Sequence, residues 1–151
     1  MSYRPATDDD VPLLVAWHAD PEVSRYWDGD TFTAEEMRER LRRSDVDMWI
    51  VEEHGAPVGY LQSWWEPDPP KRGGLEGFVV PEARGRGVMP AAARSLAERL
   101  LEEGWHSVTV DPYAWNERAL RGWANAGFVE ESRHPPDEDH LSGWVLMRFS
   151  G

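Results

Sequence analysis

One stretch, residues 74–101, constrains the fold most, because it joins an apolar run, a glycine-rich turn and an amphipathic segment. Leu75 to Val80 is apolar and β-branched apart from Glu76, which predicts a strand. Pro81 ends this strand because proline has no N–H to donate to a neighbouring strand. From residue 88 onward, apolar residues recur every three or four positions, which predicts a helix of about four turns. These apolar residues are Val88, Ala92, Ala93, Leu96, Ala97, Leu100 and Leu101.

The turn between this strand and this helix reads RGRG, residues 84–87. Glycines let the backbone approach a bulky ligand, and the free N–H groups and dipole at a helix N-terminus attract an anion. The two arginines add positive charge. The turn therefore predicts an anion site, and a tight turn without a ligand is the alternative. The sequence contains neither GxxxxGK[ST] nor GxGxxG, which excludes a P-loop and disfavours a dinucleotide site.

The composition limits the kinds of partner. With 151 residues, the chain is expected to form a single domain, residues 1–151. Its net charge of −12 argues against nucleic acid and favours a cationic substrate, although solubility alone is an equal explanation. There is no cysteine, which excludes disulfides and cysteine nucleophiles. We find no signal peptide and no long apolar run, so we expect a cytoplasmic protein without membrane contact.

Strands and helices alternate unevenly along the rest of the chain. Strands are predicted at 2–5, 48–53, 58–65, 107–110, 128–132 and 144–149, and helices after Thr7, Pro21, Thr33 and Asn116. Consecutive strands at both ends indicate an α+β (mixed α/β) fold. The arginines of the Thr33 helix are interpreted as a solvent-exposed face. They are Arg38, Arg40, Arg42 and Arg43.

Two segments together resemble the GCN5-related N-acetyltransferases, which bind acetyl-coenzyme A. Residues 84–89 follow the pattern R-x-x-G-x-(G/A) of that family except for Met89, whose larger side chain could crowd phosphates. Residues 110–128 place Asn116 and the pair Gly127-Phe128 where the family has an asparagine and a Gly-Phe pair. The resemblance covers nearly the whole chain. It implies a mostly antiparallel central sheet of about six to seven strands, flanked by helices and splayed between strands 4 and 5.

The same resemblance implies a set of cofactor-binding residues. Asn116 would contact the pantetheine region, although a simple helix N-cap is an alternative. The family commonly has a tyrosine that protonates the departing thiolate at the position of Trp123, and an indole cannot supply that proton. Tyr113 is a possible substitute or a surface residue, and Trp123 also fits a core position. The implied set is Phe78, Val79, Val80, Arg84, Gly85, Arg86, Gly87, Val88, Met89, Asn116 and Trp123.

Within the family, four segments are similar to the aminoglycoside 6′-N-acetyltransferases. They read GYLQSW at 59–64, GLE at 74–76, VDP at 110–112 and YWDG at 26–29. The similarity implies a small cationic amine as acceptor, with an acidic loop at 137–139 closing over the pocket. The implied acceptor-site residues are Trp27, Asp28, Gln62, Trp64, Glu76, Asp111 and Asp137.

Amine acetylation needs a base, because an ammonium must lose a proton before it can attack a thioester. Glu76 and Asp111 are the predicted catalytic carboxylates, and the N–H groups near Val79 and Val80 could polarise the carbonyl. Transfer would be direct. Each carboxylate also has an alternative without a catalytic role. Glu76 could be an exposed strand residue, and Asp111 could form the turn before Pro112.

Two other functions stay open at this stage. The hydroxylysine acetyltransferases of siderophore assembly have a similar N-terminal segment, and a non-catalytic acyl-coenzyme A-binding module would tolerate Met89 and Trp123. The five histidines are scattered without metal-site spacing, so no metal site is predicted. The chain is expected to be a monomer or a homodimer.

Overall fold

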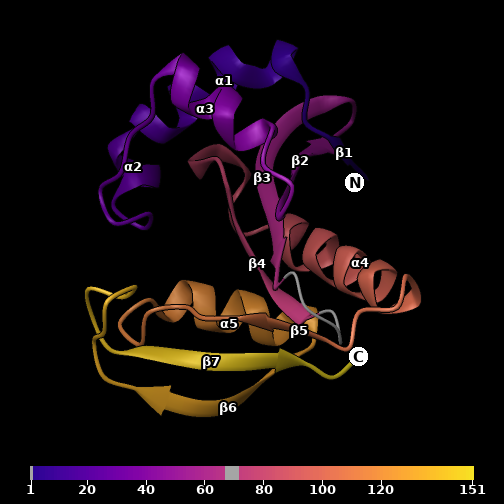
Figure 1. Ribbon diagram of the computed structural model, residues 1–151, viewed down its shortest axis with the longest axis vertical. Coiled ribbons are helices and arrows are strands. Elements are labelled where there is room, and N and C mark those ends of the chain that lie inside the picture. The colour runs from indigo at the N-terminus through magenta and orange to yellow at the C-terminus, as the bar shows by residue number, and fades with distance from the viewer. Residues whose placement is uncertain (1, 67–71) are drawn as a thin grey trace.

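The computed structural model describes residues 2–66 and 72–151, which form one seven-stranded sheet with helices on both faces (Figure 1). The predicted loop 66–73 therefore lies mostly outside the described residues. The strand order is β1-β2-β3-β4-β5-β7-β6. The strands are β1 (Ser2–Pro5), β2 (Val46–Glu53), β3 (Ala56–Trp65), β4 (Arg72–Val79), β5 (Ser107–Val110), β6 (Phe128–His134) and β7 (Trp144–Phe149).

The predicted splay between the fourth and fifth strands is present. Every neighbouring pair is antiparallel except β4 and β5, which run parallel. Their pairing is confined to Arg72–Gly74 opposite Ser107–Thr109. Beyond Gly74 the two strands diverge, and Figure 1 shows the N-terminal half of the sheet separated there from the half that holds β5, β6 and β7. The backbone of β4 after Gly74 thus faces an opening instead of a neighbouring strand.

Short helices cover one face of the N-terminal strands, and longer ones pack against the rest of the sheet.

The helix after Thr33 begins as expected, because the Thr33 hydroxyl accepts from Glu36 N at 3.1 Å while Glu36 Oε1 accepts from Thr33 N at 2.9 Å. The helices are α1 (Val11–Ala19), α2 (Pro21–Ser24), α3 (Ala34–Leu41), α4 (Val88–Glu102) and α5 (Glu117–Ala126), with 3₁₀ turns η1 (Asp8–Asp10) and η2 (Pro81–Ala83).

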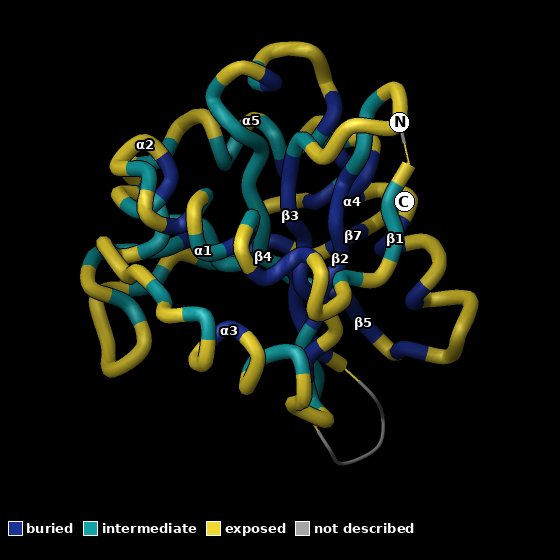
Figure 2. Tube along the Cα trace, turned by 90° about the horizontal axis from the view of Figure 1, so that it is seen from above, coloured by how far each residue is buried: buried dark blue, intermediate teal, exposed yellow. Residues whose placement is uncertain are grey.

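Helix α4 buries the face that its apolar periodicity predicts, and Figure 2 shows β2 and β3 as largely buried strands nearby. Ala92, Ala93, Leu96 and Ala97 are fully buried in the larger of two core clusters. The prediction for Leu101 was wrong, since its side chain is 37% exposed. Leu101 stands at the margin of the stripe, where the helix surface already turns to solvent.

Element boundaries differ from the sequence prediction where pairing extends a strand. β2 begins at Val46 because Val46 pairs with Trp64, and β6 reaches His134 because His134 pairs with Trp144. Arg72 and Gly73, predicted as loop, belong to β4. Such extensions depend on a partner strand distant in sequence, so local propensity does not report them. Within the described residues, no helix is both long and apolar enough to cross a membrane.

Candidate active site

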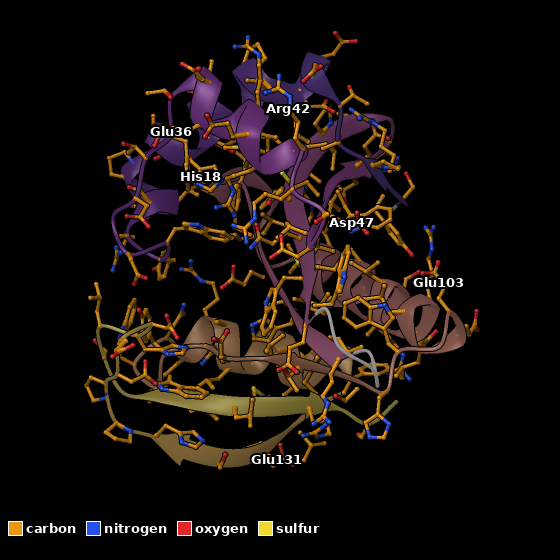
Figure 3. All side chains as sticks on the ribbon, viewed as in Figure 1. His18, Glu36, Arg42, Asp47, Glu103 and Glu131 are labelled. Carbon is orange, nitrogen blue, oxygen red and sulfur yellow. The ribbon has the colours of Figure 1, made fainter. Side chains whose placement is uncertain are left out.

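A cavity of about 900 Å³ occupies the opening where β4 and β5 diverge. Its walls come from both halves of the sheet, and side chains of both halves project into this space in Figure 3. The turn before α4 and the start of α5 line one end. The α2–α3 region, β3 and the 139–140 loop line the other. We call these ends the cofactor arm and the acceptor arm, after the ligands that the sequence predicts for them.

The cofactor arm is built on the glycine turn. Gly85 and Gly87 have φ angles of +83° and +72°, which other residues adopt only at a cost, and the space beside each α-carbon is open to 4 Å. Both line the cavity, as do Val88 and Met89 at the N-terminus of α4. The turn therefore presents backbone N–H groups and a helix dipole to the cavity, as an anion site requires.

Other predicted cofactor residues divide between the cavity and its surroundings. Arg84 lines the cavity and donates to the Glu22 carbonyl at 2.7 Å. Arg86 does not line it, because its guanidinium pairs with Glu53 at 2.5 Å on the outer side of the turn. Met89 packs against the core around α4 and also reaches the cavity wall.

The start of α5 supplies the remaining predicted cofactor contacts. Asn116 lines the cavity and is also the N-cap of α5, accepting from Ala119 N at 3.2 Å, so both of its predicted roles are compatible. Trp123 is 9% exposed, packs edge-on against Phe128 and still lines the cavity. Its core position and its place on the cavity wall are likewise compatible.

The sequence predicted backbone N–H donors near both Val79 and Val80, and the structure leaves only the N–H of Val79 directed at the cavity. The Val80 N–H is already bonded to the Val58 carbonyl at 2.9 Å, so it cannot polarise a ligand carbonyl. In an antiparallel ladder, successive N–H groups point to opposite edges, so the Val79 N–H points away from β3. That edge of β4 faces the opening, and Val79 and Phe78 both line the cavity.

Glu76 lies at the centre of the acceptor arm and is held by a polar network. Gln62 Nε2 donates to Glu76 Oε2 at 2.6 Å, while Gln62 Oε1 accepts from Arg40 and from Tyr60 Oη, each at 2.6 Å. Arginine only donates, so the orientation of the Gln62 amide is fixed by its neighbours. Burial, and then the charge of Asp111, raises the pKa of Glu76 to about 7.

A histidine joins two of the other predicted carboxylates, Asp111 and Asp137. His140 Nε2 lies 2.7 Å from Asp111 Oδ2, and His140 Nδ1 lies 2.8 Å from Asp137 Oδ1. Burial lowers the pKa of His140, but the hydrogen bonds to Asp111 and Asp137 outweigh it and raise that pKa above its usual value. Asp111 and His140 line the cavity, whereas Asp137 does not and instead accepts from Trp144 Nε1 at 3.0 Å.

Tyr113 connects the two halves across the cavity mouth. Its hydroxyl donates to Asp28 Oδ1 at 2.5 Å and accepts from Leu141 N at 3.1 Å. Burial and the bond to Asp28 raise the pKa of Tyr113 to about 12, so the phenol keeps its proton at neutral pH. Trp27 and Trp64, which the resemblance placed in the acceptor pocket, also line the cavity.

Three residues of this site were not identified from the sequence. Arg40 was interpreted as part of a solvent-exposed face, yet it lines the cavity and bonds Gln62. His140 was treated as one of several scattered histidines, and Tyr60 received no role. The place of His140 in an acidic loop, three residues after Asp137, was a weak signal for His140. Nothing local distinguishes Arg40 from its neighbours in α3.

Comparisons with known proteins agree with this geometry. Residues 6–135 match the family described as an acetyltransferase (GNAT) domain. The fold superposes on AAC(6′)-Ib, solved in complex with paromomycin and acetyl-CoA, with a TM-score of 0.84 and 25% identity over 98% of this chain and 92% of that chain. A ribosomal-protein-alanine N-acetyltransferase from Brucella melitensis superposes with a TM-score of 0.79 and 21% identity over 98% of each chain.

A third solved structure, an aminoglycoside N(6′)-acetyltransferase from Legionella pneumophila, gives a TM-score of 0.79 at 18% identity over 98% of this chain and 90% of that chain. The lower-identity matches support the fold alone. The domain match covers most of the chain, and the glycine turn, the splayed strands and the cavity between them all agree with it. The chain therefore belongs to the GNAT acetyltransferase family.

Proposed function

We propose that this protein transfers an acetyl group from acetyl-CoA to a primary amine of a small cationic acceptor. One observation carries the proposal: Glu76 lies on the wall of a cavity that joins an anion-binding turn to an acidic pocket, with a pKa near 7. A carboxylate with that pKa is half ionised at neutral pH, which suits a general base.

The residues of the cofactor arm fit acetyl-CoA. The left-handed glycines at 85 and 87 leave room beside the backbone, and the α4 N-terminus attracts the pyrophosphate. Arg84 and the exposed Arg118, both on the cavity wall, add positive charge there. Phe78, Asn116 and the Trp123 indole would hold the pantetheine arm along the opening. The bound cofactor supplies the acetyl group as a thioester.

In the acceptor arm, Glu76 would take a proton from the bound ammonium at a carboxylate oxygen. Gln62 holds that carboxylate through its 2.6 Å hydrogen bond, so the proton is received at a fixed position. The Val79 N–H, directed into the opening, would donate to the carbonyl oxygen of the acetyl group. Asp28 and Asp111 would attract the cationic acceptor.

Trp123 is not a proton donor in this scheme, since an indole N–H does not ionise at neutral pH. Tyr113 carries a proton but is bonded to Asp28 and Leu141. A thiol has an ordinary pKa of about 8.5, so a thiolate is an adequate leaving group without a tyrosine acid. We therefore assign Tyr113 to positioning of the pocket.

An aminoglycoside is the acceptor that the AAC(6′)-Ib match favours. A hydroxylysine-type acceptor, as in siderophore assembly, is the second candidate, because the cavity also contains arginine side chains. A binding module without catalysis is the third, and the ionisable Glu76 in the cavity argues against it.

The test is release of free thiol from acetyl-CoA with a panel of aminoglycosides, polyamines and lysine derivatives. Glu76→Gln should lower the rate by about a hundredfold or more, in the range of general-base contributions. Glu98→Gln, an exposed change on the outer side of α4, serves as the control and should leave the rate unchanged. If coenzyme A binds and no amine releases thiol, the acetyltransferase proposal is wrong and a binding module is favoured.

A further inference from the structure

Arg40 differs from the other basic residues near the acceptor arm. It lies in the last turn of α3, is half-buried and lines the cavity. One guanidinium nitrogen, Nη2, donates to Gln62 Oε1, and the guanidinium carbon stands 5.1 Å from the centre of the Phe32 ring. No carboxylate within residues 2–66 and 72–151 forms an ion pair with it. A guanidinium has five N–H donors, so most of its capacity is open to a ligand.

Its neighbour Arg43 shows the contrast. Arg43 also lines the cavity, but Asp45 neutralises it through two hydrogen bonds of 3.0 and 2.9 Å. Arg40 instead donates to the neutral oxygen of Gln62 and also interacts with the neutral hydroxyl of Tyr60. The charge of Arg40 lowers the pKa of Glu76, but no carboxylate among the described residues pairs with it directly. A partly buried cation without a direct ion pair favours an anionic ligand group.

The acidic side of the pocket is also less negative than its composition suggests. Asp111 is paired with His140, whose pKa is raised and which therefore carries positive charge over a wider pH range. Glu76 is half protonated at neutral pH. Asp30 and Asp139 line the cavity without an ion pair among the described residues. The acceptor arm therefore keeps negative charge for an ammonium group, together with the cation at Arg40.

The positions of Arg40 and Glu76 set the size of the acceptor. Both bond to the same Gln62 amide, each through a contact of 2.6 Å. An amine at Glu76 and an anion at Arg40 would therefore lie within one small molecule. A carboxylate matches the fork of an arginine through two parallel hydrogen bonds.

We infer that the acceptor carries a carboxylate besides its reacting amine, and that Arg40 binds this carboxylate and sets acceptor specificity. The acceptor class is a basic amino acid or a small derivative of one. This inference rests on the proposed acetyl transfer, and it favours the amino-acid type of acceptor over an aminoglycoside, which carries no carboxylate.

The experiment compares acceptors that differ only in the carboxylate. Lysine is paired with cadaverine, and ornithine with putrescine. The wild-type protein should show a higher kcat/KM for the amino acid of each pair. Arg40→Met should lower kcat/KM for the amino acids by about ten- to a hundredfold, as expected for charged hydrogen bonds, mainly through KM. The values for the two diamines should change little when they are measured above the acid limb of both proteins, where Glu76 is ionised.

Two controls separate specificity from structural damage. Arg42→Met changes the adjacent exposed arginine, labelled on the outer side of α3 in Figure 3, and should leave the ratio within each pair unchanged. In Arg40→Met the acid limb of the kcat profile with cadaverine should move above 7, because the Arg40 charge lowers the pKa of Glu76 in the wild type. The two members of each pair are therefore compared at a pH above the acid limb of both proteins. Arg40→Lys should restore part of the preference.

Equal losses for lysine and cadaverine in Arg40→Met, or a wild-type preference for the diamines, would overturn the inference. Failure of the proposed function gives a different result, since no amine of either kind would release thiol. In that case calorimetry of lysine and cadaverine binding to the coenzyme A-loaded protein still decides the role of Arg40. Tighter binding of lysine that Arg40→Met abolishes supports the inference, and equal binding refutes it.

Discussion

The hydrogen bond from Gln62 Nε2 to Glu76 Oε2 has a consequence that a pH profile can measure. Burial and the Asp111 charge raise the pKa of Glu76 to about 7, while the Arg40 charge and the bond from Gln62 oppose that shift by stabilising the carboxylate. A hydrogen bond to a charged group contributes about 1.5–3 kcal/mol. Because one pKa unit corresponds to about 1.4 kcal/mol, Gln62→Leu should raise the pKa of Glu76 by about one to two units.

The assay is thiol release as a function of pH, with kcat/KM as the measured quantity. In the wild type the rate should rise with pH and level off above about 7, because Glu76 must be ionised to accept a proton. In Gln62→Leu the same rise should appear between about pH 8 and 9. At pH 7 the ionised fraction of Glu76 would then fall from about one half to about one tenth or less.

Tyr60→Phe is the matched control, because it removes another bond to the same amide. The Tyr60 hydroxyl donates to Gln62 Oε1, so its loss leaves the Nε2 bond to Glu76 in place. The acid limb of Tyr60→Phe should stay near 7. An acid limb that does not move in a folded Gln62→Leu protein would refute the assignment of this limb to a Glu76 carboxylate held by Gln62.

Two further predictions concern stability. Gly73→Ala would place a Cβ 1.7 Å from the Trp64 carbonyl oxygen, so it should lower the free energy of unfolding by more than about 4 kcal/mol or abolish folding. In Gly122→Ala of α5 the new Cβ meets nothing within 4 Å, so this change should stabilise the protein by about 1 kcal/mol. Denaturant unfolding of both variants measures the two values, and equal effects would contradict the prediction. Burial lowers the pKa of His18 from 6.5 to about 4, so below pH 6.5 the unfolded chain binds more protons than the native state and stability falls as the pH falls. Unfolding measured at pH 7 and pH 5 should show a loss of about 2 kcal/mol that is absent in His18→Asn, and a parallel loss in both proteins would exclude His18 as its source.

Much of the architecture was predictable because it depends on local patterns. The bounds of β5 and β7, the start of α4 at Val88 and the N-cap at Thr33 follow from apolar periodicity and capping residues. The left-handed Gly85 and Gly87 follow from the need for positive φ in the turn. Each of these features is determined within a few residues of chain.

The splay of the sheet was predicted only through the resemblance to a family. No sequence pattern in β4 indicates that its pairing with β5 ends after Gly74. That divergence depends on packing between remote segments, since the larger core cluster joins residues of β2–β4 to residues of β5–β7. The cavity is a product of this packing, since its walls come from both halves.

The sequence by itself determined the class of the fold and the glycine turn before α4, and it predicted carboxylates at 76 and 111 for the site. Only the tertiary structure decided which groups surround those carboxylates. It brought Arg40 of α3 to Gln62 of β3, and His140 to Asp111, from positions 22 and 29 residues apart. The physical reason is that a pKa and a ligand preference depend on burial and on charges within a few ångströms, and such distances are set by packing between segments remote in sequence.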